Sequence, residues 1–170
     1  MPDPKDNRPG GQLQRGGNQY EQRNREEPTL DSLWIGYLNG GYFDTDGNLK
    51  HEYVSRAKVE PLVKAMSRAE PKLTMHQVRR FFQHCRAIEA RLKAKTTTWG
   101  AEKAIFYKLD SAAADAFGKS SRKIPKLFHD FIQKNVAIVD TEEHFLKGFM
   151  LHFEALVGFG SQHLKEKERN

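Results

Sequence analysis

The chain contains a single cysteine, Cys85, so no disulfide can form within it and Cys-rich zinc sites are excluded. No apolar run approaches the ~18 residues that a membrane span needs. The first ten residues are polar and rich in Pro and Gly, so they lack the apolar centre of a secretory signal. These absences predict a cytoplasmic protein that makes no contact with a membrane.

Stretches with the two-residue periodicity of β-strands are also missing, whereas helical periodicity recurs along most of the chain. We therefore expect an all-α fold, a compact bundle of about five helices. The first runs from about His51 to Ala69. The second opens at Thr74, which forms a capping box with Gln77, and the third spans about Trp99 to Phe117. The fourth buries apolar residues from Ile124 to Val136, and the fifth is capped by Asp140.

The composition divides the chain into three parts. Residues 1–29 are rich in Gly, Arg and Gln and have almost no apolar side chains, so we expect a disordered tail. Residues 30–160 carry the helical patterns and form the bundle domain. Residues 161–170 form a charged C-terminal end.

Enzyme motifs appear only as fragments. His152 and Glu154 match half of a zinc deaminase signature, but the Pro-Cys-x-x-Cys that must follow them is missing. His129 and Asp130 resemble the doublet of metal-dependent HD phosphohydrolases, without a convincing arrangement of further ligands. We therefore expect a protein that is not an enzyme and binds no metal or cofactor. An HD-type hydrolase built on His129 and Asp130 is kept as the alternative.

Basic charge is concentrated in one predicted helix. The chain has a net charge of +6, and residues 74–95 contain six Lys or Arg side chains against one acid, Glu89. Arg79, Arg86 and Lys93, spaced by seven, form one stripe, which we call the seven-residue stripe. Arg80 and Arg91, with Lys95 nearby, form a second stripe. We expect most of these charges to lack an acidic partner within the helix, which favours binding to a phosphate backbone.

Arg122 and Lys123 add a second basic cluster just before the fourth helix. The bundle would then present one face suited to a nucleic acid. The other interpretation of such a face is a protein–protein adaptor, in which the basic helix contacts an acidic partner.

Three segments in this order resemble the small subunit of type III-A (Csm-type) CRISPR effector complexes. They are residues 41–54, residues 74–82 and residues 149–157. The resemblance implies a non-catalytic helical subunit that stacks with copies of itself as an inner filament. Its implied partners are crRNA, target RNA and the backbone and large Csm-type subunits, in antiviral defence.

The resemblance also implies that the helix beginning at Thr74 supplies RNA-binding residues, here Arg79 and Arg80. The next helix of the family often has a Tyr followed by an Arg; here Tyr107 is followed by Lys108, which we take as its substitute. The predicted RNA-binding residues are therefore Arg79, Arg80, Arg86, Arg91, Lys93, Lys95, Lys108, Arg122 and Lys123.

Overall fold

The computed structural model describes residues 26–118, 120 and 122–167, so most of the predicted tail lies outside it. Within this part of the chain, strand-like pairing is limited to an isolated bridge between Phe43 and Leu49. The predicted all-α fold is therefore confirmed. The elements in chain order are α1 (Leu30–Leu33), the 3₁₀-helix η1 (His51–Val54), α2 (Arg56–Arg68), α3 (Met75–Lys93), α4 (Trp99–Gly118), α5 (Lys126–Ile138), the π-helical segment η2 (His144–Phe149) and α6 (Met150–His163).

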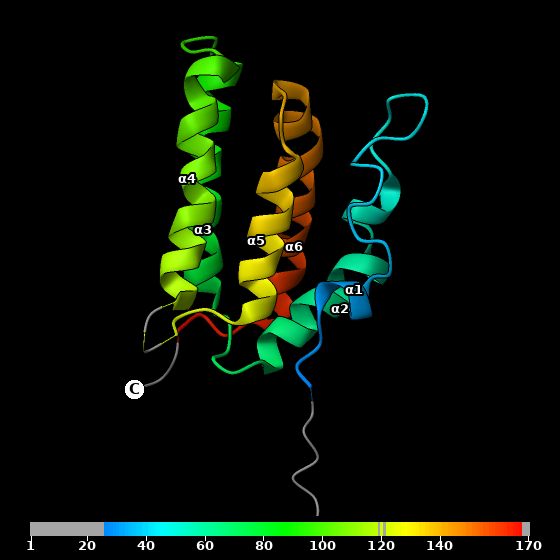
Figure 1. Ribbon diagram of the computed structural model, residues 1–170, viewed down its shortest axis with the longest axis vertical. Coiled ribbons are helices and arrows are strands. Elements are labelled where there is room, and N and C mark those ends of the chain that lie inside the picture. The colour runs from blue at the N-terminus through cyan, green and yellow to red at the C-terminus, as the bar shows by residue number, and fades with distance from the viewer. Residues whose placement is uncertain (1–25, 119, 121, 168–170) are drawn as a thin grey trace, which may run out of the picture.

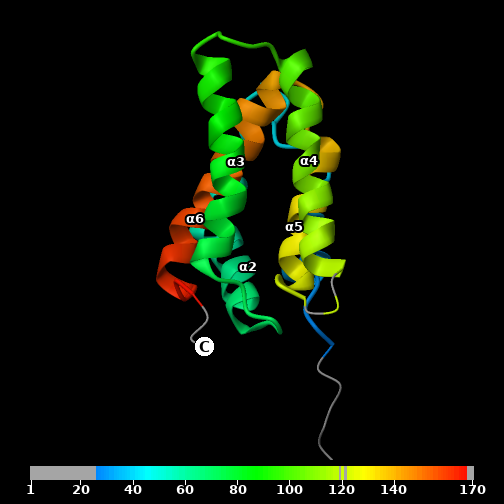
Figure 2. The ribbon, with the colours of Figure 1, turned by 90° about the vertical axis from the view of Figure 1, so that its left-hand side faces the viewer.

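The helices are arranged so that α3 and α4 form one side of the bundle. They run antiparallel there, while α5 and α6 occupy the middle and α1 and α2 the other side (Figure 1). Seen from that side, α3 and α4 lie next to each other in front of the remaining helices (Figure 2). α3 contacts α4 and α6, α4 contacts α5, and α2 contacts both α5 and α6.

Phenylalanine side chains form the centre of the core. Those that are completely buried are Phe106, Phe128, Phe131, Phe145, Phe149 and Phe153. Phe153 has ring neighbours on α3, α5 and η2, with centroids 5.1 Å from Phe82 and 5.5 Å from Phe149. The last helix is thus buried against several helices at once.

The capping box predicted at Thr74 is confirmed. The Gln77 amide donates to Thr74 Oγ1 at 3.3 Å, and the Thr74 amide donates to Gln77 Oε1 at 3.0 Å. The predicted Asp140 cap is wrong. Thr141 Oγ1 accepts from the His144 amide at 3.1 Å, because the Asp140 carboxylate is instead bound by Lys103 Nζ at 2.5 Å.

Two further helix boundaries differ from those expected. The helix predicted from about His51 begins at Arg56, because residues 51–54 form a separate 3₁₀-helix, and it continues through Pro61. At the other end, α6 extends past residue 160 to His163. The next carbonyl groups, those of Lys165 and Glu166, accept hydrogen bonds from the first amides of α3, Met75 (2.8 Å) and His76 (3.1 Å). The C-terminal segment thereby satisfies backbone donors that a helix start otherwise leaves unpaired.

Candidate nucleic-acid interface

The seven-residue stripe of α3 is ion-paired. Arg79 Nη1 lies 2.6 Å from Glu166 Oε2. Arg86 Nη1 and Lys93 Nζ each lie 2.7 Å from a carboxylate oxygen of Glu89. Arg86 and Lys93 thus have an acidic partner within the helix, whereas the partner of Arg79 lies outside it. Glu89 stands three residues after Arg86 and four before Lys93, while Glu166 comes from the C-terminal segment.

Glu89 is held as an anion by these two contacts. Its burial acts to raise the pKa of the carboxyl, but hydrogen bonds from Lys93 and Arg86 outweigh burial and leave the pKa below its usual value. Removing Arg86 or Lys93 from Glu89 would leave a nearly buried charge with one partner fewer. These two cations are thus less available to an external phosphate than the sequence indicated.

Arg91 joins α3 to the start of α4. Its Nε and Nη2 donate to the two carboxylate oxygens of Glu102, both at 2.8 Å, in a bidentate pair. Glu102 is only 3% exposed, and the hydrogen bond from Arg91 is the main cause of the lowered pKa of its carboxyl. The structure thus gives Arg91 a packing partner across the helix pair.

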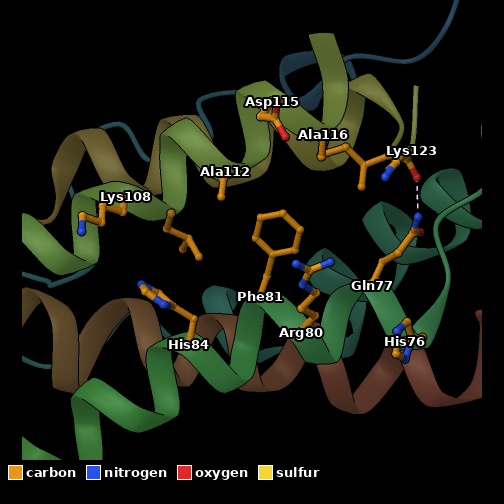
Figure 3. Close-up of a pocket in the computed structure, with 12 residues that line it drawn as sticks. His76, Gln77, Arg80, Phe81, His84, Lys108, Ala112, Asp115, Ala116 and Lys123 are labelled. Carbon is orange, nitrogen blue, oxygen red and sulfur yellow. Dashed lines mark hydrogen bonds between the residues drawn. The ribbon is translucent and has the colours of Figure 1, made fainter. Parts of the chain in front are cut away.

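Three of the predicted cations, Arg80, Lys108 and Lys123, lie around a groove between α3 and α4. The groove has a volume of about 400 Å³, and Lys123 and Ile124, which precede α5, also line it. Figure 3 shows Arg80 and His84 of α3 on one wall and Lys108 of α4 on the other, with Lys123 at one end. No ion pair joins Arg80, Lys108 or Lys123 to an acid among the residues described here.

Local hydrogen bonds fix the two ends of the groove. At one end, Gln77 Nε2 donates to the Lys123 carbonyl, while the Lys123 amide donates to the Ala116 carbonyl at 3.0 Å. Further along, His84 Nε2 lies 3.1 Å from the Ile105 carbonyl oxygen. The Lys123 backbone is therefore anchored to both helices, which brings Lys123 to the groove that Arg80, 43 positions earlier in the chain, also lines.

The other two predicted residues lie outside the groove lining. The Arg122 guanidinium stacks over the Phe117 ring, 4.5 Å from its centroid, next to Lys123 in the chain. Lys95 follows α3 with a left-handed φ of 56°, at the opposite end of that helix from Gln77. The structure thus gathers Arg80, Lys108 and Lys123, and separates them from Lys95.

Sequence reasoning missed several residues that line the groove, namely His76, Gln77, Phe81 and Asp115. His76, Arg80 and His84 are spaced by four, so helical spacing alone could have placed them on one face. Phe81 is only partly buried, and its ring points into the groove (Figure 3). Nothing local in the sequence indicates that Asp115 faces them across a helix pair.

The residues of the hydrolase alternative have other partners. His129 stacks on Phe117 with centroids 4.8 Å apart, and its Nδ1 lies 2.9 Å from Asp130 Oδ1. Asp130 also accepts a hydrogen bond from Lys126. Across the described ranges, no group of three or more His, Cys, Asp or Glu side chains is placed to hold a metal ion.

Comparison with known proteins gives one match. No curated protein and no solved structure matches the chain. None of the described helices combines the length and apolar character required to cross a bilayer. A family model described as Csm2 Type III-A matches residues 54–166, which is more than half of the chain and includes α2, α3, α4, α5 and α6. The chain therefore belongs to the Csm2 Type III-A family, the small subunits of type III-A CRISPR complexes.

Proposed function

We propose that the protein is a non-catalytic subunit that binds the RNA backbone, holding target RNA or the crRNA–target duplex in the complex. Copies of the chain stack as the inner filament, beside the other Csm-type subunits, in the prokaryotic cytoplasm. Membership of a structural small-subunit family supports this assignment. The groove between α3 and α4 provides the contacts with RNA.

The observation that carries the proposal is the convergence of Arg80, Lys108 and Lys123 on this groove. They come from two helices and a loop, and none is neutralised by an acid in the described part of the chain. A phosphate backbone presents regularly spaced negative charges that such cations can bind without reading base sequence. The predicted residues outside the groove contribute to RNA binding only as far as they can exchange their present ion-pair partners for a phosphate.

Arg79 is the predicted residue that can most easily exchange its partner. Its ion pair with Glu166 is exposed on both sides, with side chains 47% and 69% accessible. Exposed pairs of this kind contribute about 0–1 kcal/mol, so a phosphate can compete with Glu166. Arg86 and Lys93 instead share the nearly buried Glu89, and Arg91 holds Glu102. We therefore place Arg80, Lys108 and Lys123 first, Arg79 second, and the other predicted residues after them.

Salt-dependent RNA binding tests the proposal. Arg80→Ala, Lys108→Ala and Lys123→Ala should each weaken binding of single-stranded RNA to the full chain, to a similar extent for different sequences. Each lost phosphate contact should flatten the slope of log K against log salt concentration by ~0.7–0.9. Fluorescence anisotropy across a salt series measures both quantities.

Lys147→Ala is the matched control, because Lys147 is exposed and lies on η2, outside the groove lining. It should leave the slope unchanged. If the three groove variants behave like this control, the groove does not bind RNA backbone. Binding of an acidic protein in place of RNA would favour the adaptor interpretation.

A further inference from the structure

The groove contains an apolar floor, and its charged lining comprises the cations Arg80, Lys108 and Lys123 and the acid Asp115. The floor is formed by the side chains of Phe81, Leu109, Ala112, Ala116 and Ile124. Phosphate groups alone do not require an apolar surface, since they are bound by cations and hydrogen-bond donors. The floor therefore indicates that the ligand of this groove has an apolar part as well as a charged one.

Phe81 offers this part an aromatic surface. On the core side its ring packs edge-to-face with Phe128, with centroids 5.3 Å apart and planes at 82°. On the other side the ring projects into the space between α3 and α4, beneath Ala112 and beside the Arg80 guanidinium (Figure 3). Ala112 and Ala116 are small, so α4 leaves room above the ring.

We propose that this groove receives one unstacked base of a single-stranded RNA, which lies against Phe81 while the adjoining phosphates contact Arg80 and Lys123. This inference rests on the proposed RNA-binding function and specifies which form of RNA the groove takes. A base has apolar faces and a polar edge, and aromatic rings and Arg guanidinium planes are the usual surfaces on which proteins stack one. A volume of about 400 Å³ falls within the range of small-ligand sites.

A comparison of two oligonucleotides separates base binding from backbone binding. The full chain is titrated with a uridine octamer and with an octamer of abasic ribose phosphates, which has the same charge and no bases. Stacking of one base predicts that the uridine octamer binds about tenfold more tightly. Uridine is chosen because its bases stack weakly on one another in the free strand.

A matched pair of variants places the effect in the groove. Ala112 lines the groove, whereas Ala114 is exposed on the same helix and does not. Ala112→Leu fills the space above Phe81 without removing a charge, so it should abolish the tenfold preference, measured as the ratio of the variant's affinities for the two octamers. Ala114→Leu should retain the preference. Circular dichroism and urea unfolding verify that both variants fold.

The possible outcomes are distinct. Equal, salt-sensitive binding of both octamers would overturn the base site and leave the backbone proposal standing. A preference for uridine that survives Ala112→Leu would also overturn it, because the base would then bind elsewhere. Failure of both octamers to bind would contradict the proposed function itself, and the base site with it.

Discussion

At the scale of single residues, His152 shows how a polar side chain can be stable in an apolar core. It is completely buried, and its Nδ1 faces the Tyr53 carbonyl oxygen at 2.5 Å. This contact requires a proton on Nδ1, so Nε2 accepts from the Tyr37 hydroxyl at 2.7 Å. Asn135 completes the chain, donating to Tyr37 at 2.8 Å and accepting from Tyr42 at 2.7 Å. Each group can satisfy its neighbours only while His152 is neutral.

The neutral state of His152 makes stability depend on pH. Burial is the main cause that lowers the pKa of His152 to about 4, from about 6.5 in the unfolded chain. Between these two pH values the unfolded state binds a proton that the native state excludes. The contribution of His152 to the free energy of unfolding is therefore fully present above pH 6.5 and is lost as the pH falls towards 4. Urea unfolding should show that the free energy of unfolding falls by roughly 3 kcal/mol over that pH range because of this residue.

The control for this prediction is His51→Gln, because His51 is exposed and the variant should keep the pH dependence. Titration of the imidazole by NMR follows His152 directly. A His152 signal that titrates near 6.5 in the folded protein would contradict the account.

Several of these residues were recognisable in the sequence, but their partners were not. Helical periodicity predicted the helices, and the Thr74–Gln77 spacing predicted the cap, because both depend on neighbours close in the chain. The hydrogen bond between Tyr37 and His152 joins residues 115 positions apart. No local pattern signals such a pair, so His152 was noticed only as part of an incomplete enzyme motif.

At the scale of elements, α3 carries two basic stripes with different surroundings. The spacing rules placed the seven-residue stripe, Arg80 and Arg91 on this helix, because they follow from its period alone, whereas Lys95 lies beyond its end. They could not tell which stripe would be neutralised, since Glu102 and Glu166 reach α3 from α4 and the C-terminal segment. The seven-residue stripe proved to be paired, and Arg80 of the second stripe faces the groove.

Arg91 and Arg80 should therefore differ when each is replaced by Ala. Arg91→Ala leaves the nearly buried Glu102 without its bidentate partner, and we expect a loss of about 1–3 kcal/mol in the free energy of unfolding. Arg80→Ala removes no ion pair seen in the described structure, so its effect on stability should stay within about 0.5 kcal/mol. Urea denaturation of the two variants measures the difference. Equal losses would show that the Arg91–Glu102 pair does not stabilise the helix pair.

At the scale of the whole molecule, the folded unit is larger than the region that matches the family. The match begins at residue 54, yet Trp34, Tyr37 and Tyr42 before it are buried in the same core. Gly148 of η2 packs so closely on Tyr42 that a Cβ there would lie 2.5 Å from the ring. The segment after Leu30 thus packs as part of the same core as the helices that follow it.

The sequence predicted the helical class, most helix positions and the helix that carries the basic charge. It did not predict the groove, because a groove depends on how α3, α4 and the loop at Lys123 are placed relative to one another. Lys108 was included through the family resemblance, and Lys123 through a local cluster. Only the tertiary structure shows that these two residues lie at one groove with Arg80.

The central claim is that the α3–α4 groove contacts RNA in the assembled complex. The most direct measurement is ultraviolet cross-linking of the complex purified through the tagged chain from its native host, with mass spectrometry of the RNA-linked peptides. The account predicts co-purifying Csm-type subunits, and cross-links within residues 76–84 and 108–123 of this chain. Cross-links confined to other surfaces, or a chain recovered without RNA, would contradict it.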